Sequence, residues 1–130
     1  MIYLDSSALV KLVLSEPESA ALAGWLAERA DIPLASSIVH RTEVSRAVWR
    51  ANPSQLPRSY RQMRGVEIIA LSRVIAESAG TVTPHGLRSM DAIHLASALA
   101  IRNDLDAFVA YDKRLLAAAQ DAGLPTASPA

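Results

Sequence analysis

The sequence predicts a three-layer α/β/α sandwich with a central, mostly parallel sheet, and three observations support this prediction. Short apolar segments, such as residues 2–5 and 107–111, alternate with longer segments whose apolar residues recur at helical spacing. Ala and Leu supply most of the 51% hydrophobic content, and aromatic residues are few, which favours helices over strands. Strands that alternate with helices are joined by right-handed crossovers, and helices then cover both faces of the parallel sheet.

Each element can be placed in order along the chain. Ser6 or Ser7 can cap the first helix, and Asn52-Pro53 interrupts the helical pattern. Strands are expected at residues 2–5, 33–37, 66–71 and 107–111, and helices at residues 6–16, 18–30, 38–51, 56–64, 73–79, 88–102 and 113–123.

Length and composition predict a single soluble domain spanning residues 1–130, with residues 125–130 expected to fray. No segment approaches the ~20 consecutive apolar residues of a membrane span, and the N-terminus lacks the basic start of a signal peptide. A cytoplasmic protein without membrane contact is therefore expected. The chain has no cysteine, so any metal must be held by oxygen or imidazole.

The formal net charge is zero, but the basic residues are unevenly distributed. Arginine forks bind phosphate well because they donate two hydrogen bonds at once. An ordinary solvated helical face explains the same pattern equally well. Six arginines fall within 24 positions: Arg41, Arg46, Arg50, Arg58, Arg61 and Arg64.

Two aspartates close predicted strands at the point where a helix begins. Asp5 ends the first strand, and Asp112 follows the strand at residues 107–111. Sites in open α/β sheets form at the carboxyl ends of the strands. Either residue taken alone is more simply explained as a helix N-cap.

Two further acids belong to helices that start near the same edge. Asp91 lies at the head of the very apolar helix RSMDAIHLASALAIR, where it is either a first-turn acid or a carboxylate directed at the sheet edge. Glu43 lies early in the helix at residues 38–51, where an ordinary ion pair with Arg46 or Arg50 is the simpler interpretation.

Taken together, the four acids Asp5, Glu43, Asp91 and Asp112 predict a metal site. Carboxylates gathered at one sheet edge repel one another unless a cation neutralises them. Mg²⁺ and Mn²⁺ prefer such all-oxygen sites, and phosphodiester hydrolysis is the chemistry that such sites perform.

Four segments make the chain resemble the PIN domain, and within it the VapC-type toxins of bacterial toxin–antitoxin pairs. They are IYLDSSALVKL, RTEVSRAV, SMDAIHLASAL and FVAYDKRL, and they occur in the family's order over nearly the whole chain. The resemblance implies a PIN-like fold and a Mg²⁺-dependent endoribonuclease, for which Mn²⁺ can substitute. It also implies an RNA substrate, a small antitoxin partner and a homodimer.

The family's four acids match Asp5, Glu43, Asp91 and Asp112 in chain order. The resemblance implies that Asp5 and Asp91 are metal ligands, that Glu43 ligates or orients a metal-bound water, and that Asp112 completes the cluster. Ser7 is expected to hydrogen-bond within the site. Relatives commonly carry Thr or Ser where this chain has Ala110, a departure that bears on activity more than on fold.

The same residues admit other interpretations. His94 is expected to be a packed, hydrogen-bonded core residue rather than a metal ligand. A haloacid dehalogenase-type phosphatase needs a second Asp where Ser7 stands, and a receiver domain needs adjacent acids before Asp5. A PIN-like module that binds RNA or a protein partner without cutting remains the alternative function, and the absence of a hydroxyl at Ala110 keeps it open.

Overall fold

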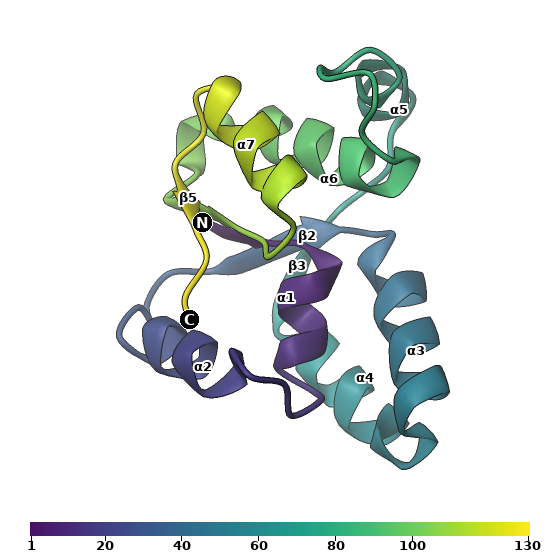
Figure 1. The fold of residues 1–130 in the computed structure, drawn as a ribbon, viewed down its shortest axis with the longest axis vertical. Coiled ribbons are helices and arrows are strands. Elements are labelled where there is room, and N and C mark those ends of the chain that lie inside the picture. Colours follow the sequence, from purple (N-terminus) through teal and green to yellow (C-terminus); the bar gives the residue numbers. More distant parts are fainter.

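A computed structural model, which describes residues 1–130, has a five-stranded sheet between two layers of helices. The strands are β1 (Ile2–Leu4), β2 (Leu34–Ser37), β3 (Val66–Ile69), β4 (Ala107–Val109) and β5 (Thr126–Ala127). The helices are α1 (Ser6–Lys11), α2 (Ser19–Ala27), α3 (His40–Ala51), α4 (Leu56–Arg64), α5 (Arg73–Ala79), α6 (Ser89–Ala100) and α7 (Lys113–Asp121), with short 3-10 turns at Pro53–Gln55 and Arg102–Asp104. In Figure 1, α6 and α7 lie above the sheet, and α1, α2 and α4 lie below it.

The sheet is entirely parallel, in the order β3-β2-β1-β4-β5, so β1 lies at its centre. Successive side chains of a strand point to opposite faces, and β1 follows this rule. Ile2 and Leu4 join the lower core, whereas Tyr3 joins the upper core with Phe108 and Leu95. All three β1 residues are fully buried, as expected for a strand covered on both faces. The predicted three-layer α/β/α sandwich is confirmed.

The helices begin where polar side chains accept their free N–H groups. The Asp5, Ser72 and Asp112 side chains accept hydrogen bonds from the backbone N–H three residues later, and so cap α1, α5 and α7. None of the seven helices is long and apolar enough to cross a membrane.

The first helix is shorter than the sequence predicts, ending at Lys11 instead of residue 16. After Lys11 the Leu12 and Val13 N–H groups donate to carbonyls only three residues back, those of Leu9 and Val10, and this tight turn ends the helix. The Ser19 hydroxyl closes the turn by donating to the Leu14 carbonyl and accepting from the Glu16 N–H. Most other boundaries lie within two or three residues of the prediction.

The C-terminal tail, for which the sequence predicts no strand and possible fraying, contains a short strand in the structure. Thr126 and Ala127 form β5, which pairs with β4. The Phe108 N–H donates to the Pro125 carbonyl at 2.7 Å, and the Tyr111 hydroxyl donates to the Pro129 carbonyl at 2.7 Å. Without this strand, one side of β4 would leave its backbone groups unpaired.

Candidate active site

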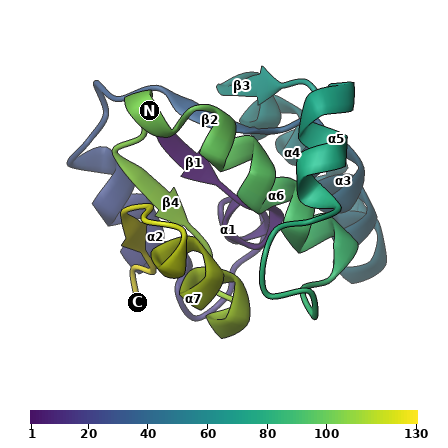
Figure 2. The same ribbon diagram turned by 90° about the horizontal axis from the view of Figure 1, so that it is seen from above.

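All four candidate acids belong to segments that follow or face the carboxyl edge of the sheet: Asp5, Glu43, Asp91 and Asp112. Asp5 follows β1, and its N–H bonds to the Val109 carbonyl at 3.1 Å, next to the end of β4. Asp112 precedes α7, and Asp91 and Glu43 lie in the first turns of α6 and α3. Figure 2 shows the start of α1, the start of α7 and α6 grouped around this edge.

Asp5 is the most deeply buried of the four acids, at 4% exposure. Its Oδ1 accepts hydrogen bonds from the Ala8 N–H at 2.9 Å and the Ser7 hydroxyl at 2.7 Å. Ser7 thus makes the contact within the site that the sequence predicts. Burial raises the pKa of the Asp5 carboxyl above its ordinary value, and the nearby charge of Asp91 adds to the increase, while the two hydrogen bonds, and His94 when it is protonated, oppose it. No lysine or arginine forms an ion pair with Asp5.

Asp91 and Asp112 share a cavity of about 130 Å³ with two arginines, Arg88 and Arg114. The Arg88 guanidinium lies 3.4 Å from the Asp91 Oδ2 and 3.8 Å from the Asp112 Oδ2, so one cation bridges the two carboxylates. The Arg88 side chain is 76% exposed, and such solvated pairs contribute at most about 1 kcal/mol. A competing cation or anion can therefore replace these contacts at small cost.

Glu43 does not form the helical ion pair with Arg46 or Arg50 that is the simplest interpretation of its spacing. Its Oε1 instead lies 2.7 Å from His94 Nε2 and accepts a hydrogen bond from the Ser6 hydroxyl at 2.6 Å. Burial by itself raises the pKa of Glu43, but these hydrogen bonds outweigh it and hold the pKa below its ordinary value. Glu43 is thus an ionised carboxylate at neutral pH.

The donor chemistry of this edge fits a hard divalent cation, although the side chains are not drawn together around one point. As they stand, no three of the chain's Asp, Glu and His groups are close enough to hold a metal ion. The fit rests on Asp5, a buried carboxylate without a cationic partner whose pKa is raised partly by a second carboxylate. Binding would require Asp91 and Asp112 to turn from Arg88 toward Asp5.

Part of this site is not evident from the sequence. The prediction that His94 is a packed, hydrogen-bonded residue is confirmed, but its partner Glu43 was not foreseen. Ser6, which the sequence predicts only as a helix cap, contacts Glu43. No role in the site is predicted for Arg88, which lies beside Asp112. The only signal in the sequence is proximity: Ser6 follows Asp5, and Arg88 and His94 each lie three residues from Asp91. Ala110 is fully buried in the upper core, so at this position the chain has a packing residue in place of a hydroxyl.

The chain is an all-parallel three-layer domain with acids at the carboxyl edge of its sheet. PIN domains belong to this class of protein. A family model described as PIN domain matches residues 2–121. Two solved structures share the fold at low identity. VapC20 from Mycobacterium tuberculosis, described as a toxin that cleaves the sarcin-ricin loop, matches with a TM-score of 0.77 and 15% identity over 99% of this chain and 100% of the other. VapBC2 from Rickettsia felis matches with a TM-score of 0.75 and 16% identity over the whole of both chains.

Curated relatives match at higher identity. Ribonuclease VapC47 of Mycobacterium tuberculosis is 43% identical over 132 residues, which covers 99% of this chain and 97% of the relative. Ribonuclease VapC35 of the same species is 39% identical over 131 residues, with 99% and 97% covered. The chain belongs to the PIN-domain family and, within it, to the VapC ribonucleases.

Proposed function

We propose that this chain is a metal-dependent endoribonuclease that acts as the toxin of a toxin–antitoxin pair. The observation that carries the proposal is Asp5, a buried carboxylate at the carboxyl edge whose charge is coupled to that of Asp91 and paired with no basic side chain. Asp5 and Asp91 would be the principal ligands of Mg²⁺, or of Mn²⁺ in its place, and Glu43 and Asp112 would complete the set. The metal would polarise a phosphoryl oxygen and lower the pKa of a bound water.

The chain's own residues supply the rest of the chemistry. Glu43, ionised and hydrogen-bonded through Oε1, can accept a hydrogen bond from the attacking water at Oε2 and so orient it. Arg88 and Arg114 line the same cavity as Asp91 and Asp112, where they can bind the phosphate next to the cleaved bond. Asp5 keeps its orientation because Ser7 and the Ala8 N–H fix one of its oxygens.

The experiment that tests the function is cleavage of a structured RNA pool by the purified protein, with Mg²⁺, with Mn²⁺ and with EDTA. Asp91→Asn is expected to reduce cleavage by about 100-fold or more, because a lost ligand removes several kcal/mol of transition-state stabilisation. EDTA should have the same effect on the wild type. Cleavage that persists equally in Asp91→Asn or in EDTA would show that this acidic edge is not the active site.

RNA is the substrate class that the arginines of α3 and α4 support. All six are exposed, none forms an ion pair, and Glu43 is the single acid between residues 41 and 64. Arg50 lines a second cavity, of about 320 Å³, that begins at Ser6, Ser7 and Glu43. Unpaired arginines on the two helices next to the acidic edge are suited to bind the phosphates of an RNA strand whose cleavage site lies at that edge.

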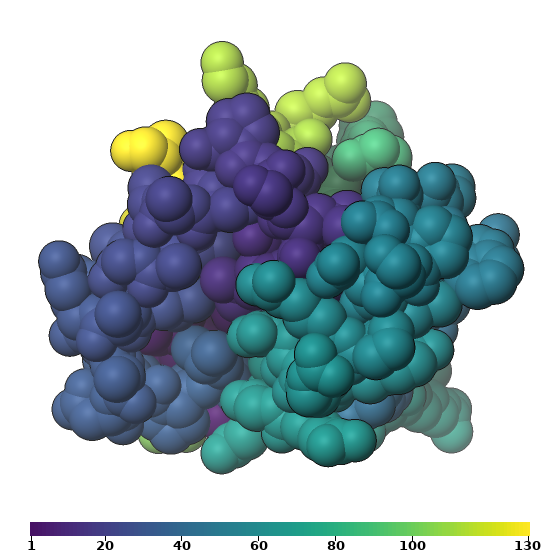
Figure 3. Space-filling model, turned by 90° about the horizontal axis from the view of Figure 1, so that it is seen from below, coloured from purple at the N-terminus to yellow at the C-terminus, as the bar shows by residue number.

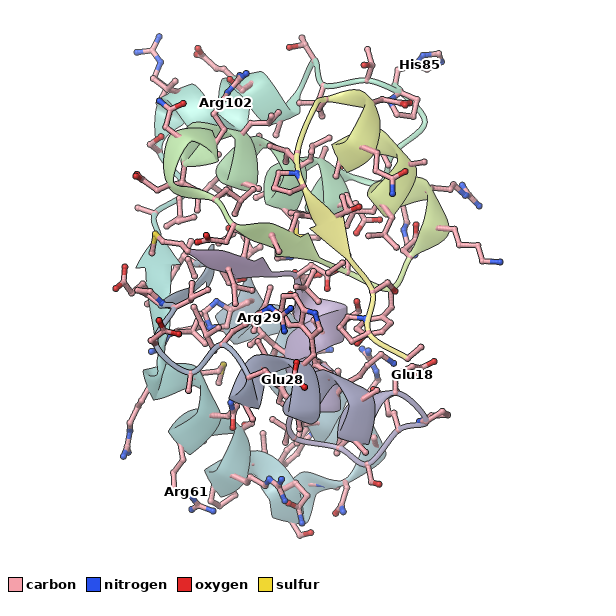
Figure 4. All side chains as sticks on the ribbon, turned by 90° about the vertical axis from the view of Figure 1, so that its left-hand side faces the viewer. Glu18, Glu28, Arg29, Arg61, His85 and Arg102 are labelled. Atoms are coloured by element: carbon pink, nitrogen blue, oxygen red, sulfur yellow. The ribbon has the colours of Figure 1, made fainter.

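Neutralising two of these arginines gives a separate prediction. Arg46→Gln combined with Arg50→Gln is expected to raise KM for RNA about tenfold at constant kcat, and to reduce the slope of log affinity against log salt by about 1–2. Arg102→Gln is the control, because Arg102 is also exposed and unpaired but lies at the opposite end of the molecule from α4 and its Arg61 (Figure 4). Equal salt slopes in the wild type and the double variant would exclude this path for RNA.

An antitoxin partner and a homodimer are part of the proposal. A hollow of about 490 Å³ between α1, α2 and the turn from α3 to α4 offers apolar contacts from Leu14, Ala20 and Ala23 beside the Arg58 charge. Figure 3 shows α1 at the base of this hollow, between α2 and α4. Exposed apolar side chains on β3, α5 and the segments beside them support dimerisation: Ile68, Leu71, Val74 and Met90.

A non-catalytic RNA- or protein-binding module is the second candidate function. The observation that favours it is that Arg88 already pairs with Asp91 and Asp112, and that no three acids converge on one point. Such a module would bind RNA equally well with and without EDTA and would show no metal-dependent cleavage. The cleavage experiment above therefore separates the two functions.

A further inference from the structure

Behind the acidic edge, buried polar side chains connect the centre of the sheet to Glu43. The Tyr3 hydroxyl on β1 lies 2.7 Å from His94 Nδ1 on α6, and His94 Nε2 lies 2.7 Å from Glu43 Oε1 on α3. Tyr3 and His94 are almost completely inaccessible, at 0% and 1% exposure, whereas the Glu43 side chain is 29% exposed. Glu43 is thus the solvent-facing end of a buried network that joins β1, α6 and α3.

The hydrogen bonds of this network fix where its protons lie. The Ser37 N–H donates to the Tyr3 hydroxyl oxygen at 3.1 Å, so the phenolic proton is available for His94 Nδ1. A carboxylate can only accept hydrogen bonds, so the proton between His94 and Glu43 Oε1 must be on His94 Nε2. In the neutral imidazole this is the single N–H, so Nδ1 has a free lone pair that accepts the Tyr3 hydroxyl proton.

Both donors to Glu43 use the same oxygen. The Ser6 hydroxyl and the His94 Nε2–H converge on Oε1, and no hydrogen bond of the protein uses Oε2. An ordinary helical glutamate would rotate among several rotamers, and its two oxygens would exchange roles. Here the carboxylate is held through Oε1, which leaves Oε2 without a protein partner, and Glu43 lines a cavity together with Ser6 and Ser7.

We propose that His94 is a positioning residue for RNA cleavage. It holds the Glu43 carboxylate in one orientation, and the hydrogen bond from Tyr3 sets the His94 tautomer that this requires. This inference rests on the proposed function and assigns a role to a residue outside the four acids. Partners that orient the ligands and acids of a metal site typically contribute 10- to 100-fold to metal affinity or activity. A histidine that only fills the core would contribute to stability and to neither quantity.

Two amide substitutions separate these roles, because each retains one nitrogen position of the imidazole. His94→Gln keeps a donor near Nε2 and hence the bond to Glu43, whereas His94→Asn keeps a group near Nδ1 and loses that bond. His94→Asn is expected to lower kcat about 10- to 100-fold with KM for RNA within about twofold. It should also weaken Mn²⁺ binding, measured by calorimetry without RNA, while His94→Gln restores much of both quantities.

His40→Gln is the matched control. His40 is also fully buried and lies one turn before Glu43 on α3, but its hydrogen bond goes to the Ser37 carbonyl. This variant should lower Tm and leave kcat and Mn²⁺ affinity unchanged. If His94→Asn fails to fold, Tyr3→Phe removes only the hydroxyl that sets the tautomer, and is expected to lower kcat a few-fold.

Three results would overturn the inference. In the first, His94→Asn cleaves RNA and binds Mn²⁺ like the wild type. Where His94→Asn does not fold, the same result with Tyr3→Phe counts in its place. In the second, His94→Gln is as impaired as His94→Asn, or all variants lose kcat in proportion to their loss of Tm. In the third, the wild type itself neither cleaves RNA nor binds Mn²⁺, which removes the proposed function together with this inference.

Discussion

Asp5→Asn is expected to abolish metal-dependent RNA cleavage, with a loss of at least about 100-fold, and at the same time to stabilise the metal-free protein. The loss follows from the proposed role of Asp5 as the central anionic ligand of the metal. The gain in stability follows from burial, because an amide has no charge to desolvate at this buried position. Asn also keeps the cap of α1, since its side-chain oxygen can accept from the Ala8 N–H as Asp5 does.

The pH dependence of this gain has a definite sign. The folded-state pKa of Asp5 is raised above its ordinary value of 3.8, so the folded protein binds the proton more tightly than the unfolded chain does. The contribution of Asp5 to stability is therefore most favourable below pH 3.8 and falls as pH rises through the raised pKa. The difference in Tm between Asp5→Asn and the wild type should be largest at neutral pH and should shrink toward acid.

Thermal melts in EDTA between acid and neutral pH measure this effect, and added Mn²⁺ should then raise the Tm of the wild type alone. Asp31→Asn is the control, because Asp31 is exposed and in no ion pair, and it should change neither cleavage nor Tm. A metal-free Asp5→Asn protein that melts below the wild type at neutral pH would contradict the burial argument. Undiminished cleavage by this variant would contradict its role as a ligand.

Phe108→Ala is expected to have the largest effect on stability. Phe108 is fully buried on β4 and stacks on Tyr3, with ring centroids 5.3 Å apart and an interplanar angle of 13°. Truncation of a buried Phe typically costs about 3–5 kcal/mol, a large part of the roughly 5–15 kcal/mol that stabilises a domain. The expected fall in Tm is roughly 10–20 °C.

Chemical denaturation at neutral pH measures this free energy of unfolding directly. Tyr60→Ala is the matched aromatic control, because Tyr60 is 48% exposed on α4, and it should cost at most about 1 kcal/mol. Equal costs for the two variants would show that the Tyr3–Phe108 contact is not central to the core. Since Tyr3 also holds His94, the folded fraction of Phe108→Ala should cleave RNA more slowly than the wild type.

Secondary structure was predictable where the local signal was strong. The strand at Ile2–Leu4 and helix α6 stand out in the sequence because apolar residues dominate both, as expected for a buried strand and a buried helix. The prediction was poorest at the end of α1 and in the C-terminal tail. A single hydroxyl, that of Ser19, closes the first turn, and the open edge of β4 recruits the tail. Neither contact has a signal in the local sequence.

The sequence by itself determined the parallel three-layer fold and the four acids, because apolar periodicity and the strand-then-acid pattern are local properties of the chain. Only the tertiary structure decided how those acids differ. Asp5 is a buried carboxylate without a basic partner, and Asp91 and Asp112 both pair with Arg88. Glu43 forms hydrogen bonds with His94 and Ser6 instead of a helical ion pair. Burial and hydrogen bonding set the charge and orientation of a carboxylate, and both depend on contacts between residues far apart in the chain, such as Glu43 and His94.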